Sequence, residues 1–323
     1  MISVANLRDK ARGVRYHPVV ANRVERAACN TVTTSTSSPI AWEPLTPYGV
    51  AAFAGASLGR LLLVQFICAL LAAGAAVWFL SDGWFPTVRE AIQQLPPDGE
   101  IRAGKLDWHG DSPRLLAEGP FLAFNVDLNH AAEFRSPAHV QIEFGRDNFF
   151  VYSLLGYAEG RYPNGWVVAF NRTELAPWWG AWEPAMLAIS FAAVVAGLML
   201  IWAVLATGYF LPAWLVAYFA NRDLTLCGSW RLAGAALMPG TLLMAAALVL
   251  YDFGILDLVR LAFVAGAHLL LGWIYLVVSP LFLPRIPAIA AIKGNPFRPT
   301  PTGRQKAEDA GQKSESGGQS ADS

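Results

Sequence analysis

Residues 61–80 read LLLVQFICALLAAGAAVWFL and decide the fold, because these twenty residues contain no Asp, Glu, Lys or Arg. As a helix rising 1.5 Å per residue, such a run spans about 30 Å, the thickness of the hydrocarbon layer of a bilayer. A cleaved signal peptide has a shorter apolar run and a shorter leading segment than the sixty residues that precede this one. We therefore predict an uncleaved transmembrane helix at residues 61–80.

Long uncharged runs recur in the second half of the chain, at residues 184–220, 232–251 and 261–283. Only 15% of all residues are charged and 54% are hydrophobic, whereas soluble domains are about 25% charged. Because the charges are missing in blocks, the blocks indicate membrane spans. We predict three further transmembrane helices, at residues 184–210, 231–251 and 258–283.

The run at 184–220 contains thirty-seven uncharged residues, about 55 Å as a helix, which is too long for one crossing and too short for two crossings with a turn. Pro184 suits the first turn of a helix, and Pro212 can end or kink it. Residues 211–230 are therefore expected to form an interfacial or cytoplasmic segment. Pro239 is expected to kink the third span.

Basic side chains flank the predicted spans on one side. Residues 1–60 carry seven basic and three acidic side chains, whereas residues 81–183 carry eight basic and fourteen acidic ones. Since Lys and Arg concentrate on cytoplasmic flanks, we expect both termini in the cytoplasm, residues 81–183 outside it, and a multi-pass protein of the inner (cell) membrane. The terminal segments, residues 1–60 and 284–323, contain tracts of Ser, Thr, Gly and Gln and are predicted to be unfolded cytoplasmic tails.

The segment at 81–183 predicts a small folded domain. Residues 84–95 place apolar side chains at helical spacing, and after them the apolar period changes to two. That pattern predicts five short strands, with a hairpin turn at 145–148, at residues 101–108, 121–128, 139–144, 149–154 and 166–170. The predicted fold class is membrane α-helical, with about four transmembrane helices and an inserted small α+β, mainly antiparallel β, extracytoplasmic domain.

The order of these parts carries a resemblance. A first span is followed by LPPDGEIRAGKLDW, FLAFNVDL, a hairpin, GYAEGRYP and a C-terminal membrane block that includes SWRLAGAALMPGTLL. This arrangement over residues 61–285 resembles an uncharacterised bacterial membrane family with a domain of unknown function, in which an I-x-x-G-x-L strand precedes an I-D strand outside the membrane. The C-terminal part looks like a Yip-type block of membrane helices. The resemblance implies an architecture and no chemistry.

Two groups of side chains are candidate functional residues. On the outer domain, the sequence DWHGD supplies a candidate surface of Asp107, Trp108, His109 and Asp111. With His130 and His139 these residues include metal-ligating types, but His-Gly-Asp is equally typical of a turn, and we predict a loop without metal or cofactor. Within the membrane, the candidate positions are Gln65, Pro239, Arg260 and His268, for which packing and backbone hydrogen bonds are the simpler interpretation.

No catalytic, nucleotide or nucleic-acid motif is present, and the basic residues flank spans instead of clustering in one folded segment. We therefore predict a non-enzymatic membrane module that contacts the lipid bilayer and whose outer domain binds a lipid or a membrane or envelope protein. A small-molecule or lipid transporter is the alternative, and a membrane enzyme comes third.

Overall fold

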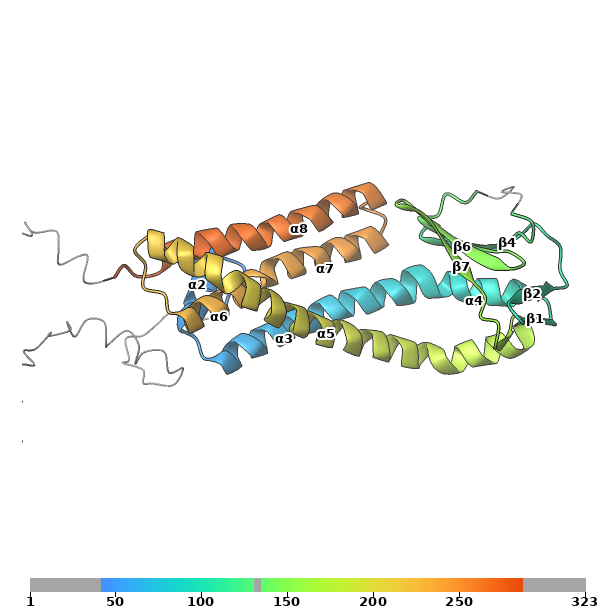
Figure 1. Ribbon diagram of the computed structural model, residues 1–323, viewed down its shortest axis with the longest axis horizontal. Coiled ribbons are helices and arrows are strands. Elements are labelled where there is room, and N and C mark those ends of the chain that lie inside the picture. The colour runs from blue at the N-terminus through green and yellow to red at the C-terminus, as the bar shows by residue number, and fades with distance from the viewer. Residues whose placement is uncertain (1–41, 131–134, 287–323) are drawn as a thin grey trace, which may run out of the picture.

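The computed structural model describes residues 42–130 and 135–286. Four helices in these residues are long and apolar enough to cross a membrane: Leu58–Gln94, Arg172–Phe219, Leu226–Asp252 and Leu258–Phe282. They extend along the long axis of the molecule, and a small β-rich domain lies at one end (Figure 1). We call this end the domain end and the opposite end the tail end. The predicted class, a helical membrane protein with a β-rich insert between its first two spans, is confirmed.

The first span continues into the domain. Helix α3 (Leu58–Phe79) passes through the π-helical turn η3 (Leu80–Trp84) into α4 (Phe85–Gln94), the amphipathic helix predicted from the sequence. Gly83 in the turn allows a close contact, because a Cβ there would lie 3.0 Å from the Phe121 ring. At this turn the first span therefore packs closely against both the domain and the other spans.

Helix α5 (Arg172–Phe219) differs from its predicted bounds. It begins twelve residues before Pro184, because Asn171 caps it by accepting a hydrogen bond from the Glu174 amide, and it runs without a break past Pro212 to Phe219. Residues 211–219 are thus the last turns of this 48-residue helix and not a separate helix. The internal prolines of α5 leave some backbone carbonyls without a hydrogen-bond partner, but the helix continues past them.

The third span is bent. Helix α6 (Leu226–Ala236) ends at Leu237, and α7 (Met238–Asp252) begins with Pro239 in its first turn, where the missing N–H interrupts the helical hydrogen bonds. The interruption at Leu237 lies two residues before Pro239, where the kink was predicted. Helix α8 (Leu258–Val278, followed by η4, Ser279–Phe282) returns beside α7 after a short connection.

The domain contains two sheets. The three-stranded sheet has the order β2-β1-β8, with β1 at Gly99–Arg102, β2 at Lys105–Trp108 and β8 at Val167–Ala169. The five-stranded sheet has the order β3-β4-β5-β6-β7, with strands at Arg114–Glu118, Leu122–Val126, Val140–Phe144, Asn148–Ser153 and Gly156–Arg161. Neighbouring strands are antiparallel except for β4 and β5, which are parallel.

The strand predictions differ from the structure at three places. The single strand expected at 101–108 is a hairpin, because Ala103 and Gly104 take positive φ angles of 50° and 76° and form its turn. Strands β3 and β7 were not predicted. The hairpin expected at 145–148 joins β5 to β6 and is confirmed.

Two apolar cores hold these parts together. One lies among α3, α5, α6 and the preceding segment of α2 (Pro47–Ala52) and η2 (Phe53–Gly55), and the other lies between α4 and the strands. At the tail end, the Arg231 guanidinium donates to the Ala56 carbonyl, which ties α6 to η2.

Candidate functional site

One face of the five-stranded sheet carries a row of polar side chains. Asn125 on β4 lies opposite Glu143 on β5, and both are buried. The Asn125 amide donates to Glu143 Oε2 at 3.3 Å, and the Gln141 amide donates to Asn125 Oδ1 at 3.0 Å. Because buried polar groups are costly unless they are bonded, a connected row of this kind specifies one arrangement of the strands.

His130 extends this row across the sheet. Its Nδ1 lies 2.7 Å from Glu143 Oε1, and its Nε2 lies 2.7 Å from Asn148 Oδ1. The Asn148 amide nitrogen donates to Glu159 at 2.9 Å, so its carbonyl oxygen is the atom that faces the ring. Both ring nitrogens therefore face acceptors, which suits the doubly protonated imidazolium.

The electrostatics of His130 agree with this geometry. Burial by itself would lower the pKa of His130, but the hydrogen bonds to Glu143 and Asn148 and the negative charges of Glu143 and Asp127 outweigh it, so the pKa is raised. Gly145 makes room for the ring, because a Cβ there would lie 2.3 Å from the ring atom Nε2. A histidine with a raised pKa is thus built into the sheet.

Beside the polar row, an open pocket of about 300 Å³ lies between the domain and the spans. We call it the junction pocket, and it is lined by Arg135, Ser136, Ala138, His139, Gln141, Tyr152, Ser153, Leu154 and Leu258. The Arg135 guanidinium lies 5.3 Å from the Tyr152 ring centroid, a cation–π distance. Leu258 is the first residue of α8, so the pocket has a polar wall from the domain and an apolar wall at the end of a candidate span.

An aromatic cluster fixes the domain against the spans next to this pocket. His139, which precedes β5, bonds to the Tyr251 hydroxyl in the last turn of α7. The Phe121 ring lies 4.8 Å from the Tyr251 ring and 5.1 Å from the Phe79 ring of α3, measured between centroids. The strands that form the junction pocket are therefore held directly over the ends of α3 and α7.

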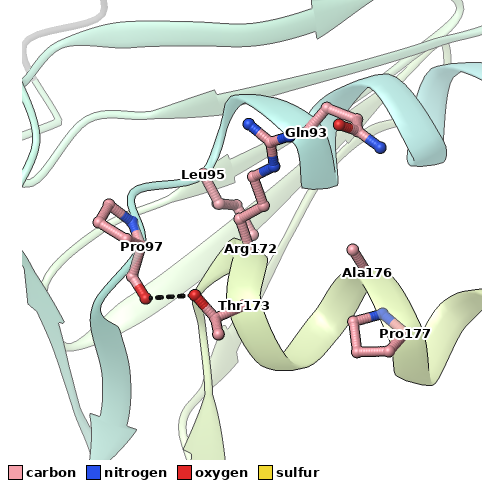
Figure 2. A pocket seen from close by; sticks show the side chains of 7 residues that line it. All are labelled: Gln93, Leu95, Pro97, Arg172, Thr173, Ala176 and Pro177. Atoms are coloured by element: carbon pink, nitrogen blue, oxygen red, sulfur yellow. Dashed lines mark hydrogen bonds between the residues drawn. The ribbon is translucent and has the colours of Figure 1, made fainter.

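A second pocket, of about 450 Å³, lies between the end of α4 and the start of α5. Figure 2 shows Arg172 extending toward α4 beside Gln93, while Thr173 Oγ1 donates to the Pro97 carbonyl at 2.9 Å. The two helix ends are tied by backbone bonds as well, since the Arg172 amide donates to the Pro96 carbonyl. We interpret this hollow as the seam between α4 and α5, and it brings a single charged side chain to an open surface.

The predicted outer surface has one buried member. Trp108 is 8% exposed, packs against Phe170 and donates its indole N–H to the Asp111 carbonyl at 2.9 Å, so it belongs to the core. His109 is exposed, with its ring nitrogens 3.7 Å from Asp107 and 3.9 Å from Asp98. Asp107 and Trp108 lie in β2, and His109 and Asp111 follow it; β2 lies at the end of the molecule opposite the tail end (Figure 1).

In residues 42–130 and 135–286, no three His, Cys, Asp or Glu side chains lie close enough together to hold a metal ion. The three histidines named from the sequence have separate partners: His109 lies near carboxylates, His130 bonds to Glu143, and His139 bonds to Tyr251.

The predicted intramembrane positions do not form one site. Gln65 is buried in α3 and donates to the Gly234 carbonyl of α6 at 3.2 Å. Arg260 pairs with Asp257 at the exposed start of α8, at 3.4 Å. His268 Nδ1 bonds to the Ala265 carbonyl of its own helix. Pro239 lies at the bend between α6 and α7. Gln65, Arg260 and His268 thus have three different partners, and these contacts bring no two of the polar candidates together.

Sequence reasoning missed the polar row, although a signal was present. Asn125 and Asp127 alternate with apolar residues in one predicted strand, and Gln141 and Glu143 do so in another. Because side chains in a strand alternate between faces, each pair had to lie on one face of its strand. The parallel pairing of β4 with β5, which joins the two pairs, could not be read from the pattern.

Comparison with known proteins adds no functional information: no family model, no curated protein and no solved structure matches the chain. The resemblance drawn from the order of its parts therefore stays a prediction.

Proposed function

We propose that this protein is a non-enzymatic membrane module whose β-rich domain binds the anionic headgroup of a lipid in the junction pocket. The observation that carries the proposal is the pairing of Arg135 with Leu258 in one pocket at the end of a candidate span. A lipid places charge and hydrocarbon at the same boundary, so a ligand of that kind meets both walls at once.

The chemistry of the pocket supports an anion. Arg135 supplies a fork of N–H donors that matches a phosphate, and the Tyr152 hydroxyl lies in the same pocket. The Ser136 and Ser153 hydroxyls also line it, but they donate to Glu118 and to the Gly156 carbonyl. Leu154 and Leu258 form an apolar border for the first part of an acyl chain.

The orientation proposed from the sequence places this pocket on the outer side of the inner membrane. At the tail end, Arg222 donates to the Leu283 carbonyl at 2.7 Å and Arg231 donates to the Ala56 carbonyl, so two of the basic flanking residues lie together at the end opposite the domain. Basic residues favour the cytoplasmic side. The lipid in the pocket would then belong to the outer leaflet.

The test is native mass spectrometry of the full-length protein in detergent, titrated with dioleoylphosphatidylglycerol and, separately, with zwitterionic dioleoylphosphatidylcholine. We expect the anionic lipid to be retained more strongly, and Arg135→Gln to weaken its retention about tenfold or more, since a charged hydrogen bond contributes about 1.5–3 kcal/mol. The matched control is Arg161→Gln, which removes an exposed arginine at the opposite end of the β6–β7 hairpin. Equal retention of the two lipids, or an unchanged Arg135→Gln variant, would refute the proposal.

The transporter alternative needs the intramembrane polar residues to line a common path. Gln65 and His268 instead bond to backbone carbonyls. A membrane or envelope protein could also bind the exposed outer domain. That alternative is not supported by an observation comparable to the pairing of charge and apolar surface in the junction pocket. We therefore place lipid binding first.

A further inference from the structure

The hairpin between β6 and β7 ends in an unusual tip. Its two-residue turn is Leu154-Leu155, between the paired residues Ser153 and Gly156. Leu154 is 60% exposed and Leu155 is 98% exposed, and Tyr157 beside them is 71% exposed. Two-residue hairpin turns normally use Asn-Gly or similar pairs, because those residues tolerate the backbone angles and face water.

The backbone does not explain the two leucines. Gly156 takes the positive φ of 116°, and the Ser153 hydroxyl accepts from the Leu155 amide at 3.3 Å, so the turn is held by its neighbours. Neither leucine is among the described residues with a positive φ. Moreover, the ten residues 149–158, FFVYSLLGYA, contain no charge. A hairpin end of this composition is suited to an apolar environment.

The position of the tip supplies that environment. Val140 pairs with Ser153, and the residue before Val140, His139, bonds to Tyr251 at the end of α7. Leu154 and Leu258 also line the same pocket. The tip therefore lies level with the first turn of α8, and the hairpin extends toward the ends of α7 and α8 (Figure 1). There α8 exposes Val259 and Phe263, the start of its lipid-facing side.

We infer that Leu154 and Leu155 insert into the leaflet on the domain side of the membrane and anchor the free end of the sheet to the bilayer. The tip extends the apolar surface of α8 beyond the helix, and Tyr157 lies where aromatic side chains favour the membrane–water interface. The interaction surface is thus the hairpin tip, and its partner is the bilayer itself. This inference does not require a lipid in the junction pocket.

The test is spin-label accessibility on the full-length protein in nanodiscs of phosphatidylcholine and phosphatidylglycerol. A nitroxide is attached to Leu155→Cys after replacement of Cys29, Cys68 and Cys227, and collisions with oxygen and with a water-soluble nickel chelate are measured. Leu155 is almost fully exposed, so the label displaces no core contact. Controls are Asp147→Cys at the opposite hairpin, exposed to water, and Phe263→Cys on the lipid-facing side of α8.

We expect the label at 155 to resemble the label at 263, with high oxygen and low nickel accessibility, at a depth of about 5–10 Å below the headgroups. Nickel accessibility equal to that at 147 would overturn the inference. Low accessibility to both reagents would also overturn it, because it would mean burial against protein, for example a second copy of the chain.

A second variant guards against a local effect of the label. With the label moved to Tyr157→Cys, replacing the turn by Leu154→Asn and Leu155→Gly should raise nickel accessibility severalfold while the hairpin stays folded. An unchanged value would count against insertion. Arg135→Gln should leave the depth at 155 unchanged, so the lipid site and the tip can fail independently.

Discussion

Replacing His130 by alanine tests the polar row on the sheet. The Glu143 side chain is only 3% exposed, and without the imidazole its carboxylate keeps, among the described residues, one long hydrogen bond, 3.3 Å from the Asn125 amide. Removing the partner of a buried charge costs about 3–5 kcal/mol. Because the His130 side chain is 29% exposed, water will replace part of the lost interaction, and we expect about 2–3 kcal/mol.

The assay is hydrogen–deuterium exchange of the full-length protein in detergent, followed by mass spectrometry of peptides that cover β4 to β6. Local exchange reports the opening free energy of these strands. A loss of about 2–3 kcal/mol corresponds to exchange roughly 30 to 150 times faster, at 1.36 kcal/mol per factor of ten. Peptides from α5 should be unaffected, since the change is confined to the sheet.

His109→Ala is the matched control, because His109 is an exposed histidine of the same domain whose carboxylate neighbours are also exposed. Adding Glu143→Gln to His130→Ala removes the buried charge and should restore much of the protection. If His130→Ala and His109→Ala exchange alike at β5, or if the double variant gains nothing, the account of a charged histidine built into the sheet is wrong.

Three further outcomes follow. Since the folded-state pKa of His130 is raised, its stabilising contribution is complete below about pH 6.5 and is lost as the pH rises through the folded-state pKa. The protection of β5 against exchange, corrected for the intrinsic exchange rate, should therefore fall over that pH range. In the Glu143→Gln variant the same protection should not change with pH. Gly240→Val should lower the thermal midpoint, because a Cβ there would lie 2.6 Å from the His268 carbonyl oxygen, whereas Gly266→Val, which faces open space, should not. Gly104→Ala should speed exchange in the β1–β2 hairpin by about tenfold or more, because the residue takes a φ of 76° and its Cβ would meet a side-chain oxygen at 2.1 Å.

The helices could be predicted from the sequence because the signal is local. Each uncharged run is at least as long as the hydrocarbon layer of a bilayer is thick, so length and composition were sufficient to find all four. Their ends were less predictable. The start of α5 depends on Asn171, whose side chain caps the helix and also donates to the Gly99 carbonyl of β1. That bond joins residues far apart in sequence, and no local pattern contains it.

The sheets show the same limit more clearly. Period-two patterns found β4, β5, β6 and β8, but β3 and β7 contain glycine or adjacent buried residues that break the alternation. The alternation also showed which side chains share the polar face of each strand, but it did not show which strands pair with each other. The junction pocket was out of reach for a further reason, since its lining comes from the domain and from the first residue of α8.

The contact between His139 and Tyr251 connects these observations. A domain carried only by α4 and α5 is supported along one side, and the opposite side of its five-stranded sheet would be free to swing. The bond to Tyr251 and the Phe79 and Phe121 rings support that side from α7 and α3. Because Val140, the residue after His139, pairs with Ser153, the same contact sets the height of both the junction pocket and the Leu154-Leu155 tip above the spans. A pocket held at a fixed height above the candidate spans supports the proposed lipid ligand, which would lie in the membrane surface.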